Sequence, residues 1–336
     1  MSLALFAASS TVAVGVLLTV LWLRWSFVTE DCWSIDFLSG REPLALAARA
    51  AGAAPAITAA FVTDIRAGFV ADPFLVRTAG RWHLFFEAYE MPARRGILAC
   101  ASSSDGRAWT YGGTVLREPF HLSYPQVVEA DGNWYMLPET GAAGAVRLYR
   151  AVEFPRRWEF VRELVGTALY DPTLVQHEGR WWLFASDTAH CLHLYGANRL
   201  EGPWTEHPAS PVVRRDPKRA RPAGRILRLD GRLLRFAQDG ETTYGSSVRV
   251  LAIIRLDDTG YEERELPDSP ILSASGQGWN RDGMHHFDAQ RGPDGEWLAA
   301  VDGNRRRTEW NWRAGARRLE RCLKQFAAGR RTGFSS

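Results

Sequence analysis

Cysteine is scarce in this chain of 336 residues. The four cysteines are Cys32, Cys100, Cys191 and Cys322, and no two of them form a C-x-x-C pair. None belongs to a Cys/His cluster at zinc-ligand spacing. The sequence therefore argues against a zinc knuckle and a dense disulfide framework, and it leaves the cellular compartment open.

The central part of the chain also lacks Pro/Ser/Gly-rich linkers and the 3.6-residue periodicity of helical repeats. It carries instead a hairpin pattern, first seen at Phe69–Tyr89, in which an apolar run, a glycine turn and a second, mostly aromatic run follow one another. Five copies are centred on Gly80, Gly132, Gly179, Gly231 and Gly295, with spacings of 52, 47, 52 and 64 residues. Propeller blades recur at roughly 40–50 residues. The sequence therefore predicts an all-β fold, a five-bladed β-propeller in one large domain.

The fifth blade is incomplete, because no strand-like run follows Asp302. Two runs near the N-terminus, Trp33–Leu38 and Ile57–Thr63, are available to supply its outer strands. Such borrowing would close the ring and remove its open edges. The expected organisation is an anchor and flank over residues 1–31, the propeller over 32–303 and a basic tail over 304–336.

Charge is absent from Leu3 to Leu23, a run of 21 positions. A membrane-spanning helix needs about 20 apolar residues, so this segment is predicted to be a single-pass anchor. A cleaved signal peptide is the alternative, but the sequence has neither a basic region before the run nor a small-x-small cleavage site at its end. Arg24 and Arg41 follow the run, which favours a propeller on the cytoplasmic side.

Positive charge is concentrated in the tail. From Asn304 to Ser336 there are ten Arg and Lys against two Glu, a net charge of +8, whereas the rest of the chain has 31 basic and 36 acidic residues, a net charge of −5. Apolar residues recur in the tail at helical spacing, so we expect a basic amphipathic helix that lies on anionic lipid or packs on the propeller flank. Nucleic acid is not expected as a partner, because the propeller is acidic and no binding motif accompanies the tail.

Function is expected at the mouth of the ring, which is the end where the first strand of each blade begins and the second strand ends. Counting from the turn glycines places many carboxylates there, together with a tyrosine and two histidines: Asp72, Glu87, Glu139, Asp171, Asp187, Asp239, Asp288 and Asp302, with Tyr124, His285 and His286. Like charges that are close together raise some pKa values. Paired carboxylates with different pKa values are what glycosyl hydrolysis or transfer requires.

Several phrases carry a family resemblance over roughly Trp33 to Gly303. Among them are FVADPF, EPFHLSYPQVVE, WYMLPET, RPAG, FAQD and HHFDAQ. They resemble the N-terminal propeller domain of plant glucosamine inositolphosphorylceramide transferases and its stand-alone bacterial relatives. In the plant proteins the recognised transferase domain is a separate C-terminal one. More distantly, the chain resembles family 43 glycoside hydrolases, and this resemblance implies that Asp72 is a general base and that Asp171 orients and tunes the acid.

The fourth blade departs from the family 43 pattern, which implies a glutamic acid there as the general acid. The chain has Arg221-Pro222-Ala223-Gly224 at this point, so Glu139 and Glu241 are the acids that could substitute. Arg221 would suit an anionic group of the ligand, such as a phosphate or a uronate, or it could pair with a neighbouring acid.

Two functions are compatible with these residues. In the first, the mouth carries out glycosyl-bond chemistry on a glycan or glycolipid, with Asp72 as base or nucleophile, Glu139 as proton donor and Asp171 orienting the acid or the sugar. The expected substrate-binding set is Glu87, Tyr124, Arg221, Asp239, Glu241, His286, Asp288 and Asp302. No cofactor is expected, although a structural cation could lie at the axis. In the second, the propeller only binds the glycan and presents it to a partner glycosyltransferase.

Overall fold

The computed structural model describes residues 15–46 and 54–331. The chain divides into two compact units. Cys32–Arg305 forms one unit, and the two chain ends together form the other.

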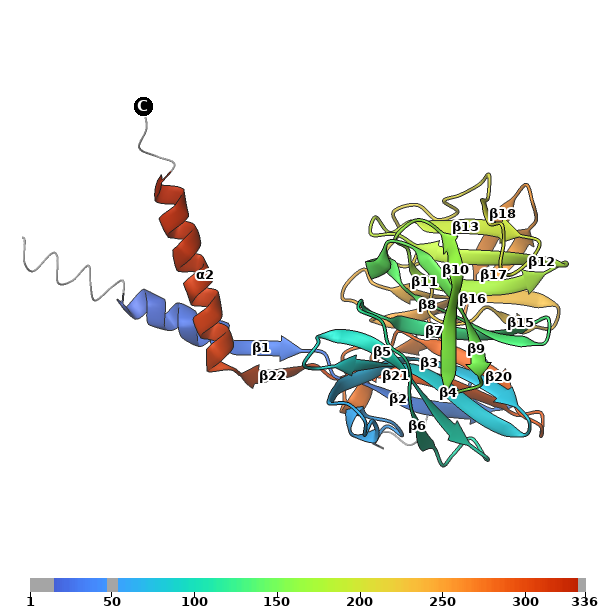
Figure 1. Ribbon diagram of the computed structural model, residues 1–336, viewed down its shortest axis with the longest axis horizontal. Helices are drawn as coiled ribbons and strands as arrows, with labels where there is room; N and C mark the ends of the chain where they lie inside the picture. The colour runs from blue at the N-terminus through green and yellow to red at the C-terminus, as the bar shows by residue number, and fades with distance from the viewer. Residues whose placement is uncertain (1–14, 47–53, 332–336) are drawn as a thin grey trace, which may run out of the picture. The chain divides into compact units, whose positions relative to one another are not determined.

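The unit Cys32–Arg305 is a five-bladed β-propeller of antiparallel sheets (Figure 1). The first three blades are four-stranded and follow the chain in order. Blade one contains β3 (Ala67–Thr78), β4 (Arg81–Glu90), β5 (Arg95–Ser103) and β6 (Thr110–Leu116), and blade two contains β7 (Ser123–Ala130), β8 (Asn133–Glu139), β9 (Val146–Glu153) and β10 (Arg157–Val165). Blade three contains β11 (Tyr170–His177), β12 (Arg180–Ser186), β13 (Leu192–Ala197) and β14 (Thr205–Glu206).

The fourth blade contains β15 (Leu227–Leu229), β16 (Arg232–Asp239), β17 (Ser247–Leu256) and β18 (Tyr261–Glu265), and the short β19 (Leu272–Ser273) also pairs with β17. The fifth blade contains β20 (Phe287–Arg291), β21 (Trp297–Asn304) and, from the other end of the chain, β2 (Trp33–Gly40). The prediction of a five-bladed ring is therefore confirmed.

Two-residue turns join the first two strands of blades one to four. In the first blade Ala79 and Gly80 connect Thr78 to Arg81, with φ of 49° and 76°. Positive φ at both central residues is the type I′ turn, whose twist matches that of the flanking strands. The same combination occurs at Asp131-Gly132, Glu178-Gly179 and Asp230-Gly231. These glycines set the register of the hairpins and with it the residues that meet at the mouth of the ring.

Five apolar clusters hold the blades together, one between each pair of neighbours. Leu98 and Met136 belong to the cluster between blades one and two, and the next three clusters continue in the same way around the ring. The fifth cluster joins the last blade to the first, because Ile35 of β2 packs with Leu84 of β4. Hydrophobic burial between the last and the first blade therefore closes the ring.

The second N-terminal strand expected for the fifth blade, Ile57–Thr63, is wrong in extent. Only Ile57 bridges the sheet: its N–H and carbonyl pair with those of Ile35 at 2.9 and 2.8 Å. The chain then turns into the 3₁₀ helix η1 (Ala59–Phe61), in which the amides of Phe61 and Val62 bond to Thr58 and Ala59. Local hydrogen bonds thus occupy the amides that a longer ladder would need.

The second unit contains a helix over residues 15–26, strands β1 (Phe27–Glu30) and β22 (Arg307–Trp310), and helix α2 (Trp312–Arg331). The predicted basic tail helix is therefore present. Among the described residues, none of the helices is long and apolar enough to cross a membrane. The predicted anchor, Leu3–Leu23, lies in large part outside the described residues.

The closure of the ring predicts a large stability cost for Ile35→Ala. Ile35 is completely buried, and large-to-small substitution at such a site costs about 2–5 kcal/mol through lost contacts and a residual cavity. Ile254→Ala is the matched control, because Ile254 is 54% exposed and its loss should change stability by less than about 0.5 kcal/mol. Urea unfolding followed by tryptophan fluorescence measures both variants, and equal midpoints would contradict this account of ring closure.

Candidate functional site

The innermost strands of blades one, two and three share one backbone distortion, which lies at the second residue of β7 and β11 and at the sixth residue of β3. Asp72, Tyr124 and Asp171 each precede a proline and have φ of 53°, 49° and 50°. Each lies at a point where the pairing with the next strand shifts register. Left-handed conformations of non-glycine residues cost on the order of 1–3 kcal/mol and gather at functional sites. The strain therefore marks this end of the ring, and β-bulges of this kind re-aim side chains.

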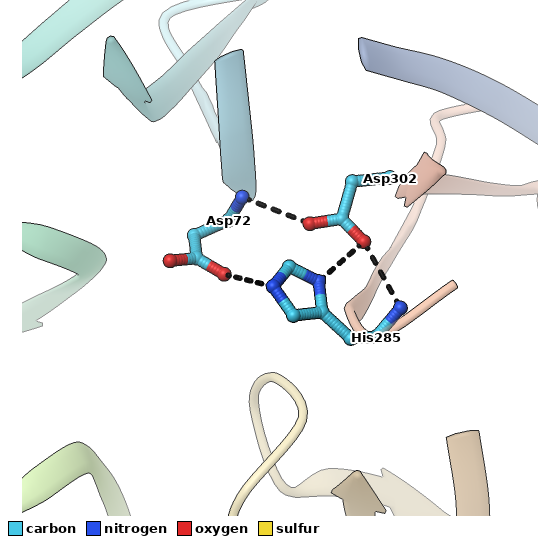
Figure 2. Close-up of side chains that lie close together, drawn as sticks. All are labelled: Asp72, His285 and Asp302. Carbon is cyan, nitrogen blue, oxygen red and sulfur yellow. Dashed lines mark hydrogen bonds and ion pairs between the residues drawn. The ribbon is translucent and has the colours of Figure 1, made fainter. Parts of the chain in front are cut away.

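An Asp–His–Asp arrangement connects the first and last blades (Figure 2). His285 Nδ1 lies 2.7 Å from Asp302 Oδ1, and His285 Nε2 faces Asp72 Oδ1 at 3.7 Å. Asp302 Oδ2 accepts the backbone N–H of Asp72 at 3.0 Å. The ring of Trp33 stacks on His285 with centroids 3.9 Å apart, which fixes the imidazole plane. The Asp72 carboxyl is thus held beside an imidazole whose orientation is set from behind.

A second group surrounds Asp171. Arg221 Nε donates to Asp171 Oδ2 at 2.5 Å, and Gln238 Nε2 donates to the same oxygen at 2.8 Å. The guanidinium of Arg221 lies over the rings of Tyr170 and Tyr244, 5.6 and 5.2 Å from their centroids. Arg221 is therefore oriented by both an ion pair and two aromatic faces.

Glu87 and Glu139, at the ends of β4 and β8, differ in how their oxygens are satisfied. Glu139 accepts from Ser123 Oγ at 3.1 Å and from the Gly141 N–H at 2.9 Å. Glu87 Oε1 is buried without a hydrogen-bond partner, and His121 Nε2 lies 3.7 Å away. A buried unpaired carboxyl oxygen is costly unless the group is protonated or meets a ligand.

The electrostatics separate the acids into two kinds. Burial raises the pKa of Asp72 to about 7, with the His285 charge opposing and the Asp171 carboxylate adding to the shift. Burial also raises the pKa of Glu139 to about 7 and that of Glu87 well above its usual range. Burial acts on Asp302 in the same direction, but His285 outweighs it and lowers the pKa of Asp302.

Near neutral pH the site thus holds an ionised Asp302 beside three carboxyls that can carry protons. The pKa of His285 is raised: burial lowers it, but the Asp302 and Asp72 carboxylates outweigh burial. Groups that gain or lose a proton near pH 7 are suited to general acid–base chemistry.

The structure brings together Asp72, Glu87, Glu139, Asp171, Arg221 and Asp302, all of which the sequence singled out. Of the other predicted substrate-binding residues, His286 adjoins this cluster, with its Nδ1 3.7 Å from Asp72 Oδ1, and the rest lie in structural contacts. Asp288 is fully buried and binds Arg225 Nε at 3.0 Å and the Leu75 N–H at 2.6 Å. Burial raises its pKa. These contacts tie the inner strands together below the mouth.

Tyr124 and His286 are also buried completely. The Tyr124 hydroxyl lies 2.9 Å from Thr173 Oγ1 and accepts the Gly224 N–H at 2.6 Å, so it links the second blade to the third and to the segment before β15. His286 packs edge-on against Phe74, and burial lowers its pKa to about 3, which keeps the ring neutral.

The fourth-blade acids Asp239 and Glu241 have their own cationic partners. Asp239 Oδ2 pairs with Arg249 at 2.7 Å. Glu241 is exposed and pairs with Lys218 at 2.8 Å. The position of Glu241 therefore does not support it as the general acid, whereas Glu139 lies near Asp171 and Arg221.

Four further residues contribute to the site, although the sequence analysis assigned no role to them: His285, Gln238, Trp33 and Tyr244. His285 and Gln238 fall within the counted mouth positions, so the repeat spacing could have identified them. Trp33 and Tyr244 reach His285 from the N-terminal strand and from the loop after β16, and no repeat position points to either. Contacts of this kind depend on ring closure.

The same three side chains of the Asp–His–Asp arrangement could in principle bind a cation. One ligand atom from each of Asp72, His285 and Asp302 lies within 4.8 Å of the others. Both Asp302 oxygens, however, already accept N–H groups, from Asp72 and from His285. An ion could use Asp72 Oδ1 and His285 Nε2 with water, whereas Asp302 Oδ1 is already occupied by the backbone N–H and the ring Nδ1 of His285. The arrangement is accounted for by a hydrogen bond between His285 and Asp302 and an ion pair between His285 and Asp72.

Comparison with known proteins shows the family to which the chain belongs. Residues 29–304 match the family model described as "Glucosamine inositolphosphorylceramide transferase 1, N-terminal". The chain belongs to this family. It is 37% identical over 302 residues to glucosamine inositolphosphorylceramide transferase 1 of Oryza sativa subsp. japonica, which covers 82% of this chain and 40% of that protein. The chain therefore spans well under half of the curated relatives that it matches.

Solved structures of glycoside hydrolases share the fold of this family member. The catalytic domain of the Coprinopsis cinerea GH62 α-L-arabinofuranosidase aligns with a TM-score of 0.53 at 14% identity, over 81% of this chain and 96% of that chain. Zg3597, a family 117 glycoside hydrolase from Zobellia galactanivorans, gives a TM-score of 0.50 at 13% identity, over 81% and 90% of the two chains. At this identity the likeness establishes the propeller fold and not an activity.

The raised pKa of Asp72 predicts a pH dependence of stability. The folded value is about 7 and the unfolded value about 3.9, so the folded state binds the extra proton between them. Stability contributed by this group is fully present below about pH 4 and is lost as the pH rises to about 7. Asp72→Asn removes this contribution, so its melting temperature should fall less than that of the wild type across this range.

Asp268→Asn is the control for this experiment, because Asp268 is an exposed acid on the loop after β18. It should keep the full wild-type slope. Glu87 and Glu139 have shifts of the same sign, so the slope of Asp72→Asn should be reduced and not abolished. Identical slopes for Asp72→Asn and the wild type would contradict the shift.

Proposed function

We propose that the propeller mouth binds the sugar portion of a glycan or glycolipid and catalyses hydrolysis or transfer at a glycosyl bond. The observation that carries the proposal is the buried carboxyl cluster, in which Asp72 and Glu139 have pKa values near 7 beside ionised Asp302. Structural cores rarely keep several carboxyls in mutual range, because each is costly to bury. Acid–base chemistry gives such a cluster a use.

In the proposed reaction Asp72, in its ionised form, acts as base or nucleophile. As a base it takes the proton of the attacking water or acceptor hydroxyl, while a protonated Glu139 gives its proton to the departing glycosidic oxygen. His285, oriented by Asp302 and Trp33, favours the anionic form of Asp72. Asp171, held by Arg221 and Gln238, orients the sugar or the acid.

The proposed substrate is a glycan that carries an anionic group, such as the phosphate of an inositolphosphorylceramide headgroup. Support comes from the name of the family and from Arg221, whose side chain is 31% exposed although it is paired with Asp171. Arginine is suited to phosphate because its guanidinium donates several hydrogen bonds in one plane.

A second function has support from a different observation. The fourth blade presents Arg221 and Gly224 where the glycosidase-like pattern implies an acid. On this alternative the propeller binds the glycolipid and presents it to a partner glycosyltransferase without bond chemistry of its own.

Membrane attachment is part of the proposal. The uncharged run Leu3–Leu23 would anchor the protein with one pass, with the propeller on the cytoplasmic side because Arg24 and Arg41 follow the run. A glycolipid headgroup would then be within reach of a membrane-tethered propeller.

Substitution separates the catalytic function from the binding function. Asp72→Asn and Glu139→Gln keep the shape of each side chain and remove its proton chemistry, so each should lower kcat by about 10²–10⁴-fold. Glu87→Gln tests whether the unpaired carboxyl is the donor in place of Glu139. Purified wild type and variants are assayed on aryl furanosides, aryl pyranosides and activated sugar donors, with Asp268→Asn as the control. Absence of turnover on every compound, with glycan binding unchanged in Asp72→Asn and Glu139→Gln, would favour the binding module.

The anchor makes a separate prediction. Because a spanning helix is held by its apolar surface, full-length protein in isolated membranes should resist extraction by alkaline carbonate. Immunoblotting of the pellet and the supernatant measures this, and N-terminal sequencing shows whether Leu3–Leu23 remains. Release into the supernatant, or a mature N-terminus near Trp33, would contradict the anchor.

A further inference from the structure

Exposed apolar side chains are concentrated in the unit formed by the two chain ends. Among the described residues twelve large hydrophobic side chains are exposed, and eight of them belong to this unit: Val16, Leu17, Val20, Leu23, Phe27, Trp310, Trp312 and Leu323. The much larger propeller has the other four. Apolar surface gathered in this way marks a site of interaction with a partner or a membrane.

The β1–β22 ribbon places aromatic residues from both chain ends on one face. Phe27 lies directly opposite Trp310, and the two side chains are 54% and 53% exposed. Trp22 meets the Trp310 ring edge-on, with centroids 6.1 Å apart. Residues two apart in a strand share a face, so Thr29 and Thr308, whose hydroxyls are 2.8 Å apart, continue this face.

Close packing joins the two helices of this unit. The Asn311 N–H donates to the Ser26 carbonyl at 2.6 Å, and Arg318 donates to the Trp25 carbonyl at 3.2 Å. At the contact point Gly315 has no room for a side chain, since a Cβ there would lie 2.1 Å from Ser26 Oγ. The residues 15–31 and 306–324 therefore form one structural unit, the terminal module, instead of two independent tails.

Positive charge is also concentrated in the terminal module. Arg313, Arg317 and Arg321 are exposed on α2 at intervals of four residues, which places them along one stripe of the helix. Glu320, the one acidic residue of α2 within 312–324, is paired with Lys324 at 2.6 Å. Tryptophan and phenylalanine beside arginine are the combination that lies at the headgroup level of a membrane, where rings contact acyl chains and cations contact phosphates.

We propose that the terminal module binds the surface of an anionic phospholipid bilayer through its aromatic face and its arginine stripe. The occupant is a lipid surface and not nucleic acid, because the same unit also exposes tryptophan, phenylalanine, leucine and valine side chains, and Arg313 lies over the ring of Trp312 with 5.4 Å to its centroid. The ribbon makes the C-terminal helix part of the attachment that begins at the N-terminus. This proposal is independent of the chemistry at the propeller mouth.

Hydrogen exchange on the full-length protein in lipid nanodiscs tests it. The discs contain phosphatidylcholine alone or phosphatidylcholine mixed with phosphatidylglycerol, and the readout is exchange of the backbone amides of residues 312–324. Arginines near an anionic surface are attracted to it, so exchange should be slower by about tenfold or more in the anionic discs. High salt should remove the difference by screening.

The triple variant Arg313→Glu/Arg317→Glu/Arg321→Glu should lose the difference between the two kinds of disc while keeping the wild-type exchange in neutral discs. Arg150→Glu/Arg157→Glu/Arg162→Glu, which reverses three exposed arginines of the second blade, is the matched control and should retain it. Equal exchange of wild-type residues 312–324 in the two kinds of disc would overturn the proposal. A loss of the difference in the control as large as in the test variant would do so as well.

Discussion

The structure depends on the hydrogen bonds that one buried carboxylate, Asp302, accepts. Its two oxygens bind the backbone N–H of Asp72 in the first blade and the ring and backbone of His285 in the fifth. An ionised group that is fully buried persists only with such partners. The same contacts connect the last blade to the first and hold Asp72 beside an oriented imidazole, so the site depends on the closed ring.

Arg221 supplies positive charge that stabilises the ionised forms of the other acids at the mouth. It pairs with Asp171, and its charge opposes the rise in the pKa of both Asp72 and Glu139. Without a cation the carboxyls would repel one another and stay protonated to higher pH. The fourth blade therefore supplies a positive charge where a glycosidase-like pattern would supply an acid, which changes the electrostatics of the mouth from within the same fold.

Family membership and fold give different information about this protein. The sequence family is named for glycolipid transferases, whereas the solved propellers of similar fold include arabinofuranosidase and other glycoside hydrolase chains. Both associate the fold with carbohydrate, and neither assigns the chemistry, because a fold positions a site without deciding which groups occupy it. The chemistry depends on the residues at the mouth, and in this chain Glu87 of blade one and Glu139 of blade two are the carboxyls available beside Asp72.

The sequence by itself determined the five hairpins and the mouth positions of Asp72, Glu87 and Glu139, because turn glycines and alternating apolar runs encode local backbone geometry. Tertiary structure decided which acids share a partner. Asp288 occupies a predicted mouth position yet lies buried against Arg225, and Trp33 reaches His285 across 252 residues of sequence. Such pairings depend on how the five blades pack around the axis. Local periodicity fixes the face on which a side chain lies, but only the packed ring fixes the neighbour it meets.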